Sequence, residues 1–263
     1  MQTHHEAVIA HRFRHTLRDV RGPHLVRREV VVPGLDPAHD GLRIAQLSDL
    51  HVGLLTSQKK IRRAIHRAAA ERPDLTVFTG DYLCYSPKFL GLLKELISEV
   101  EGPAVAVLGN HDYWTDGEGV RKVFEHAGIS VLRNAHTEIM FNHAPLDVVG
   151  IDDAVTAHAD PDRAFHGVKA GRSRIVLTHV PSIADIAASY GSSLILAGHT
   201  HGGHVNIPKI TAGIARRLGN RYLAGFYDVG GSLLYVNKGI GSSSVPIRAG
   251  APSEVALLTL RAA

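Results

Sequence analysis

Five short apolar runs recur along the chain, and each ends in acidic, amide or imidazole side chains. The runs are rich in Val, Ile and Leu, and glycine bounds several of them, which indicates strands buried on both faces. Sheets of such strands need covering helices, so this pattern constrains the fold more than any other feature. The runs are LRIAQLSDLH (42–51), DLTVFTGD (74–81), PAVAVLGNHD (103–112), RIVLTH (174–179) and SLILAGHTH (193–201).

Helical patterns lie between these runs. Within 57–71 the apolar residues fall on one face, and Ser57 is suited to the N-cap position. Ser86-Pro87 opens a second helical pattern, and 181–190 forms a third. Strands alternating with helices predict an α/β fold with mixed sheets. Further strands are expected within 129–151, 233–238 and 254–260.

The bulk composition indicates one globular domain. The chain has 263 residues and is 44% hydrophobic, which is enough for a sizeable core. The single cysteine, Cys84, excludes an intrachain disulfide. No apolar run approaches the roughly 18–20 residues that a transmembrane helix needs, so we expect a cytoplasmic protein.

The N-terminal part of the chain is rich in arginine. We interpret residues 1–40 as a basic N-terminal arm and lead-in, and residues 41–263 as a single domain. The arm is either a solvated leader or a segment that contacts anionic lipid headgroups at the inner membrane. Aromatic residues do not interleave with these arginines, which argues against a nucleic-acid partner.

The polar ends of the five runs are expected to form one site, because ligands bind at the carboxyl ends of strands in open α/β sheets. Their donors are carboxylates, an amide and imidazoles, a mixture that suits Mn, Fe or Zn. Two divalent cations among them would leave the site positively charged, as the transition state of phosphate ester hydrolysis requires. The candidate ligands are Asp49, His51, Asp81, Asn110, His179, His199 and His201.

An ordered set of motifs carries a resemblance to a known family. SDLHVG, TGD, GNHDYW, LTHVP and AGHTHGG follow one another as in the calcineurin-like metallophosphoesterase superfamily. GIDD (150–153) and YVNKGIGSSSVPIR (235–248) resemble its YkuE-like bacterial subgroup. The resemblance implies two packed mixed β-sheets flanked by helices, in four α/β/β/α layers. It also implies two divalent metal ions, Mn, Fe or Zn, and attack on a phosphate ester by metal-bound hydroxide.

The resemblance also assigns roles by matching positions. One metal would be held by Asp49, His51 and His201, the other by Asn110, His179 and His199, and Asp81 would bridge them. His111 would contact the phosphate and protonate the leaving oxygen, with Asp112 orienting its ring. We expect His199 and His201 to alternate along an extended segment, so that each reaches a different metal.

Five further side chains are candidates for substrate contact, each with an alternative. Tyr82, Tyr113 and Trp114 follow ligands directly and either wall the cleft or pack over the sheet edge. His204 stands where the subgroup usually has glutamine, and it either touches the metal site or starts a strand. Arg248 either binds a substrate phosphate or forms a surface ion pair.

The substrate is the least constrained part of the hypothesis. The resemblance favours a phosphodiester or pyrophosphate, such as an envelope lipid or glycolipid precursor of the UDP-diacylglucosamine kind. A phosphomonoesterase or nuclease of the same superfamily is the alternative. A catalytically silent scaffold is the least favoured, because all seven ligands and His111 are present.

Overall fold

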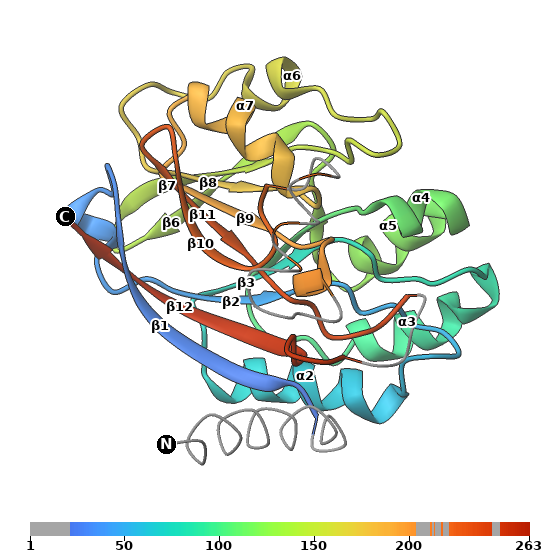
Figure 1. Ribbon diagram of the computed structural model, residues 1–263. Helices are drawn as coiled ribbons and strands as arrows, with labels where there is room; N and C mark the ends of the chain where they lie inside the picture. The colour runs from blue at the N-terminus through green and yellow to red at the C-terminus, as the bar shows by residue number, and fades with distance from the viewer. Residues whose placement is uncertain (1–21, 204–210, 212, 214–216, 218–220, 244–247) are drawn as a thin grey trace, which may run out of the picture.

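Two six-stranded mixed sheets pack face to face (Figure 1). The computed structural model describes residues 22–203, 211, 213, 217, 221–243 and 248–263. In the first sheet β2 to β5 run parallel, and β12 runs antiparallel to β2 and parallel to β1. Its strands, in spatial order, are β1 (His24–Val32), β12 (Glu254–Ala262), β2 (Arg43–Leu47), β3 (Leu75–Thr79), β4 (Ala104–Val107) and β5 (Ser130–Val131).

The second sheet has a parallel centre and antiparallel edges. β7, β8, β9 and β11 are parallel neighbours, and the edge strands β6 and β10 run against them. Its strands, in spatial order, are β10 (Gly225–Val229), β11 (Ser232–Val236), β9 (Leu194–Ala197), β8 (Arg174–Leu177), β7 (Ala144–Gly150) and β6 (Ala135–Phe141).

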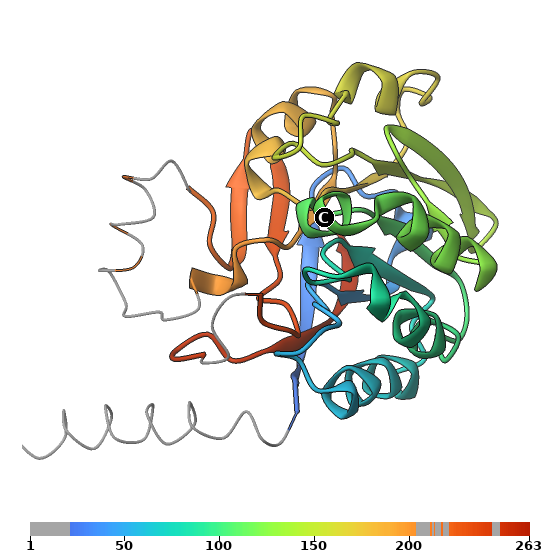
Figure 2. The ribbon, with the colours of Figure 1, turned by 90° about the vertical axis from the view of Figure 1, so that its right-hand side faces the viewer.

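Alternation along the buried strands separates three apolar layers. In β2, Ile44 faces the second sheet, whereas Ala45 and Leu47 face the helices outside the first sheet. Helices α2 (Gln58–Ala70), α3 (Leu90–Ile97) and α5 (Gly117–His126) cover that outer face. Helices α6 (Pro161–Phe165) and α7 (Ala184–Ser189) cover the second sheet, on the opposite side of the molecule (Figure 2). This arrangement confirms the four-layer fold.

The helices begin close to where the sequence predicts them. The hydroxyl of Ser57 accepts a hydrogen bond from the N–H of Lys60 and caps α2. The second and third patterns each open with a proline-led single turn, η3 (Pro87–Phe89) and η4 (Pro181–Ile183), that runs into α3 and α7. The remaining short elements are η2 (Pro37–His39), α4 (Asn110–Thr115) and η5 (His201–Gly203).

The structure places part of the predicted arm inside the fold. β1 pairs with β12 along its whole length, and Val30 and Val32 are buried between the sheets. The arginines of this segment made it look like part of the basic arm, so the strand was not predicted. In the structure Arg27 and Arg28 are exposed. The arginines within residues 1–21 lie outside the described residues. Among the helices that the structure describes, none is long and apolar enough to cross a bilayer.

Candidate metal centre

The first sheet brings four of the candidate ligands to its carboxyl edge. β2, β3 and β4 are parallel neighbours, and the segments that follow them carry Asp49, His51, Asp81 and Asn110. Backbone hydrogen bonds join the first two segments, among them those from the N–H of Asp49 to the carbonyl of Gly80 at 2.9 Å and from that of His51 to the carbonyl of Asp81 at 3.0 Å. All four side chains are buried and held on fixed backbone.

The second sheet supplies three histidines from the ends of β8 and β9. His179 follows β8, and its Nδ1 donates to the carbonyl of Thr79 at 2.7 Å. This bond fixes the tautomer of the neutral ring, in which Nε2 carries the lone pair. That nitrogen lies 3.2 Å from Oδ2 of Asp81 and 3.1 Å from Nδ1 of His199. His201 approaches from the same end of β9.

Six of the seven residues gather around two neighbouring positions. Nε2 of His51 lies 3.0 Å from Nε2 of His201, which lies 3.3 Å from Oδ1 of Asp49. Oδ2 of Asp81 lies 3.6 Å from Nε2 of His51 and 3.2 Å from Nε2 of His179, so this one carboxylate adjoins both positions. The first cluster consists of Asp49, His51 and His201, and the second of Asp81, His179 and His199. Within each cluster the ligand atoms lie within 4.8 Å of one another.

The donor atoms fit divalent cations at both positions. Burial lowers the pKa of His51 to about 3 and that of His199 to about 4, so both rings are neutral at physiological pH, as metal ligands must be. The ring nitrogens of His51 and His201 lie 3.0 Å apart and those of His179 and His199 3.1 Å apart, close enough for each pair to bind one cation together. Oδ1 of Asn110 is buried and has no hydrogen-bond partner among the described residues, which leaves it available as a ligand.

Asp81 and His179 form an ion pair at the centre. Burial lowers the pKa of His179, but the Asp81 carboxylate outweighs it and raises that pKa to about 10. Burial has the opposite sign on Asp81, yet His179 holds its pKa below the usual range. Burial also raises the pKa of Asp49 to about 6. A cation bound by the second cluster would take the place of the proton on His179.

The backbone at the ligands is left-handed at five of the seven positions, which corrects the expectation of an extended His199–His201 segment. The φ angles are 53° at Asp49, 46° at His51, 59° at Asp81, 73° at His199 and 51° at His201. Each costs about 1–2 kcal/mol for a residue with a Cβ atom. The N–H of His199 donates to the Asp49 carboxylate at 3.2 Å, which holds this turn. Each histidine nevertheless lies in a different cluster.

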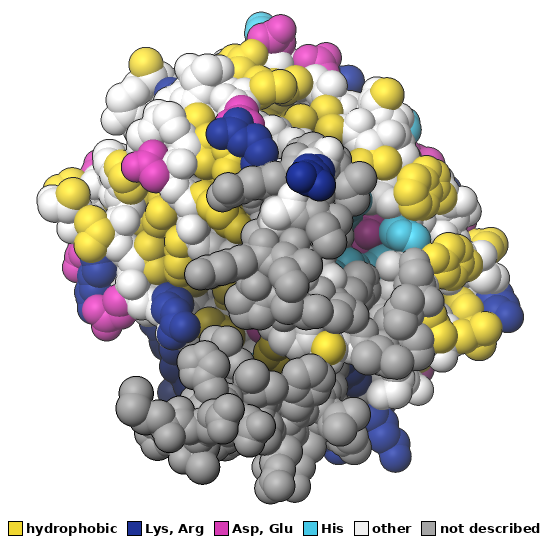
Figure 3. Space-filling view, viewed as in Figure 1, with side chains coloured by type: hydrophobic (Ala, Val, Ile, Leu, Met, Phe, Trp, Pro, Cys, Tyr) yellow, Lys and Arg dark blue, Asp and Glu magenta, His cyan; other side chains and the backbone are white. Residues whose placement is uncertain are grey.

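His111 stands between the buried clusters and solvent. Its backbone N–H donates to Oδ1 of Asp81 at 2.9 Å. Its partly exposed ring meets those of His51 and Trp114 edge to face, with centroids 4.9 and 5.0 Å away. On this face of the molecule, histidine and acidic side chains appear together in a recess, with hydrophobic side chains along one side (Figure 3).

Asp112 has partners different from the one expected. Oδ1 of its fully buried carboxylate accepts the backbone N–H groups of Tyr82 and Leu83, and Oδ2 accepts those of Asp81 and Gly109, at 2.8 to 3.0 Å. Within the described residues it makes no hydrogen bond to the ring of His111. Asp112 is the third residue of α4, so its side chain turns back toward the amides at the helix start. It positions the Asp81 segment, and it does not orient His111 directly.

Two of the five expected substrate contacts are buried and engaged elsewhere. Tyr82 is fully buried, and its hydroxyl donates to the carbonyl of Val107 at 2.5 Å. Arg248 is also buried, donating to the carbonyl of Lys238 at 2.6 Å and to Nδ1 of His201 at 2.7 Å. Neither side chain lines a cleft, and Arg248 instead supports a metal-ligand candidate.

The other three expected contacts differ among themselves. Tyr113 is half-buried, and its hydroxyl donates to Asp152 at 2.6 Å. Trp114 is 63% exposed at the mouth of the recess. His204 lies outside the described residues. The sequence reasoning missed Tyr85, whose ring is 67% exposed and has its centroid 5.5 Å from that of His111. Its nearness to the TGD motif is the one signal that could have indicated it.

Comparison with known proteins agrees with this geometry. The family model for the calcineurin-like phosphoesterases matches residues 42–203. The chain is 28% identical over 244 residues to the uncharacterised metallophosphoesterase YkuE of Bacillus subtilis, covering 90% of this chain and 84% of YkuE. It is 26% identical over 275 residues to the UDP-2,3-diacylglucosamine pyrophosphatase LpxG of Chlamydia trachomatis, covering 83% of each.

A solved structure supports the fold independently. A dimetal phosphatase from Danio rerio superposes with a TM-score of 0.52 at 12% identity, over 86% of this chain and 94% of the other. The family model covers all seven candidate ligands and His111. The chain therefore belongs to the calcineurin-like phosphoesterase family and is a metal-dependent phosphoesterase.

Proposed function

We propose that the chain hydrolyses a phosphodiester or pyrophosphate bond with two divalent metal ions, Mn, Fe or Zn. The observation that carries this proposal is the pair of buried clusters that share the Asp81 carboxylate beside the partly exposed His111. When bound, the two ions supply an activated water and positive charge for the phosphoryl transition state.

The chain's own residues have separate tasks in this reaction. The first cluster would hold one ion, the second cluster with Asn110 would hold the other, and Asp81 would contact both. His111 would donate a proton to the leaving oxygen, because its ring lies at the solvent side of the clusters. Asp112 fixes the backbone of the Asp81 segment, so both clusters depend on it.

The mouth of the site supports a substrate with an apolar part. Leu54 is 86% exposed, and Leu55, Tyr85 and Trp114 are exposed as well, although large apolar side chains usually avoid water. Tyr85 and Trp114 lie beside the ring of His111, and Leu54 and Leu55 belong to the segment that follows β2. An acyl chain of an envelope lipid or glycolipid precursor suits this rim, and the name of LpxG points to the same class of substrate.

We propose a cytoplasmic location with peripheral contact to the inner membrane. A lipid-linked substrate would require such contact. The arginine-rich residues before β1 have the charge that anionic headgroups attract.

The test combines metal content with a substrate panel. Wild-type protein and Asp81→Asn would be assayed with p-nitrophenyl phosphate, bis-p-nitrophenyl phosphate, single-stranded DNA and a UDP-linked diacyl glycolipid. We expect about two metal ions per wild-type chain, fewer in the variant, and hydrolysis of the diester and glycolipid that collapses in the variant. Preference for the monoester or for DNA would contradict the proposed substrate class, and folded protein that binds no metal would refute the function.

A further inference from the structure

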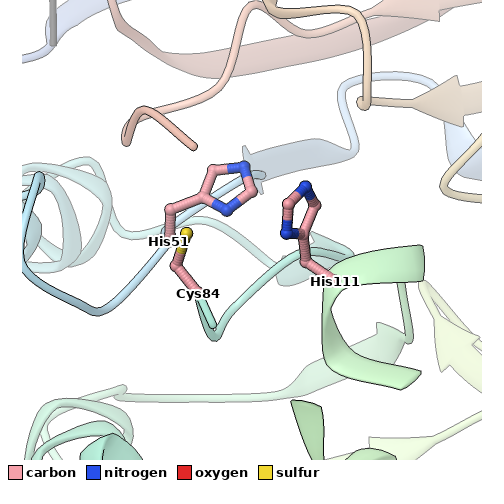
Figure 4. Close-up of side chains that lie close together, drawn as sticks. All are labelled: His51, Cys84 and His111. Atoms are coloured by element: carbon pink, nitrogen blue, oxygen red, sulfur yellow. The ribbon is translucent and has the colours of Figure 1, made fainter. Parts of the chain in front are cut away.

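A third group of side chains that could hold a metal ion adjoins the centre, and its cysteine takes no part in the proposed reaction. One ligand atom each of His51, Cys84 and His111 lies within 4.8 Å of the other two. The three residues follow β2, β3 and β4, and Figure 4 shows their side chains converging. This group differs from the other two clusters because it contains sulfur.

His51 presents an unsatisfied atom to this group. Its Nε2 faces His201 and Asp81, whereas its Nδ1 is buried without a hydrogen-bond partner among the described residues. Buried ring nitrogens of metal-binding histidines normally donate to a carbonyl or carboxylate, as Nδ1 of His179 does here. In Figure 4, Nδ1 of His51 lies on the side of the ring that faces Cys84 and His111.

Cys84 is held firmly and is not a preformed thiolate. It is buried, its N–H donates to the carbonyl of Val52 at 3.2 Å, and its thiol makes one long contact with the carbonyl of Ser243 at 3.7 Å. Burial raises the pKa of its thiol to about 11, so it is a poor nucleophile at neutral pH. A borderline or soft cation removes such a proton by direct coordination.

We propose that Nδ1 of His51, the sulfur of Cys84 and a ring nitrogen of His111 bind a third cation, Zn²⁺ or Cd²⁺, and that its binding inhibits the enzyme. Two nitrogens and a thiolate are a typical three-ligand set for zinc, with one position left for water. On binding, the Cys84 thiol and Nδ1 of His51 each release a proton to solvent, and His51 bridges two ions as imidazolate. No electron transfer is involved.

Inhibition follows from the part that His111 plays. A ring nitrogen that coordinates a cation cannot donate a proton to a leaving group, so the third ion removes the general acid. This half of the inference rests on the proposed function, whereas the binding half does not. Cys84 takes no part in the proposed hydrolysis, which separates the two halves experimentally.

The experiment compares wild type with Cys84→Ser, which preserves side-chain volume. Both proteins would be dialysed to equilibrium against increasing Zn²⁺, and bound metal measured by mass spectrometry. We expect about one more zinc per chain in wild type than in Cys84→Ser, and this difference cancels weak binding by surface histidines. With Co²⁺, a thiolate-to-metal charge-transfer band should appear in wild type after the second equivalent and be absent from the variant.

Activity on bis-p-nitrophenyl phosphate completes the design. At two equivalents of zinc both proteins should have equal rates, and excess zinc should lower the wild-type rate at least tenfold while sparing Cys84→Ser. Equal zinc content in the two proteins, or no charge-transfer band in wild type, would overturn the third site. Excess binding without loss of rate would overturn inhibition alone, and a third site in a protein that hydrolyses no ester would contradict the proposed function alone.

Discussion

Replacing Asp112 distinguishes a backbone clamp from a partner of His111. The carboxylate accepts four buried backbone N–H groups, two on each oxygen. Asp112→Ala removes all four acceptors. At about 1 kcal/mol for each lost bond, less the desolvation cost that a buried charge no longer incurs, the free energy of unfolding should fall by about 3 kcal/mol.

Asp112→Asn refines the prediction. Whichever way the amide is turned, its NH₂ group meets two N–H donors and its oxygen retains the other two, so we expect a loss of about 2 kcal/mol. The assay is urea unfolding at pH 8 with chelator present, because bound metal would add its own stabilisation. Asp160→Ala is the matched control: it caps α6 through one hydrogen bond at 3.0 Å and should cost about 1 kcal/mol.

The outcome separates the two roles of Asp112. If Asp112 acted by orienting His111, Asp112→Asn would lower the hydrolysis rate and leave stability and metal content unchanged. The clamp predicts loss of stability together with loss of metal, since the Asp81 segment moves. An Asp112→Ala protein no less stable than Asp160→Ala would refute the reasoning.

Three further predictions concern the centre and its mouth. Arg248→Met should weaken metal binding about 10–100-fold, because His201 loses the contact at its Nδ1. Chelator competition measures this affinity. A changed KM with intact metal affinity would instead indicate that Arg248 contacts the substrate. Protein stripped of metal should lose stability as the pH rises from 6.5 through about 10, because the raised pKa of His179 means that its ring stabilises the fold only while protonated. Urea unfolding at several pH values measures this, and the pH dependence of the free energy of unfolding should be weaker in His179→Asn. Trp114→Ala should raise KM for a diacyl glycolipid several-fold and leave that for bis-p-nitrophenyl phosphate unchanged, if the exposed ring contacts the apolar part of the substrate.

The sequence predicts the position of a ligand well where a strand end alone determines it. Asp49, Asp81 and His179 each follow a buried strand, and parallel neighbours bring such ends together. The sequence predicts the role of a residue poorly where that role depends on the direction of its side chain or on a partner far away in the sequence. Tyr82 follows a ligand directly but points into the core, and Arg248 contacts His201, which lies 47 positions earlier in the sequence. Neither fact is encoded in local spacing.

The glycines beside the ligands have a role that the sequence indicates only in part. Gly80, Gly109 and Gly198 each directly precede a candidate ligand, and at all three the missing Cβ atom matters: a Cβ at Gly80 would lie 2.5 Å from Nδ1 of His179. A Cβ at Gly109 would overlap the Asp81 carboxylate, and one at Gly198 would overlap Ser48 and lie 2.6 Å from Oδ2 of Asp49. Gly198 follows a strand of the second sheet and Asp49 a strand of the first, so the backbone of one sheet lies against side chains of the other there. The two clusters need the sheets to lie this close together. If the sheets were farther apart, His179 and His201 of the second sheet would not reach the carboxylates of Asp81 and Asp49 in the first. Five of the ligands adopt the left-handed conformation although they carry side chains, and Gly80 adopts it too, while all three glycines lie where a Cβ atom would clash with a neighbouring segment.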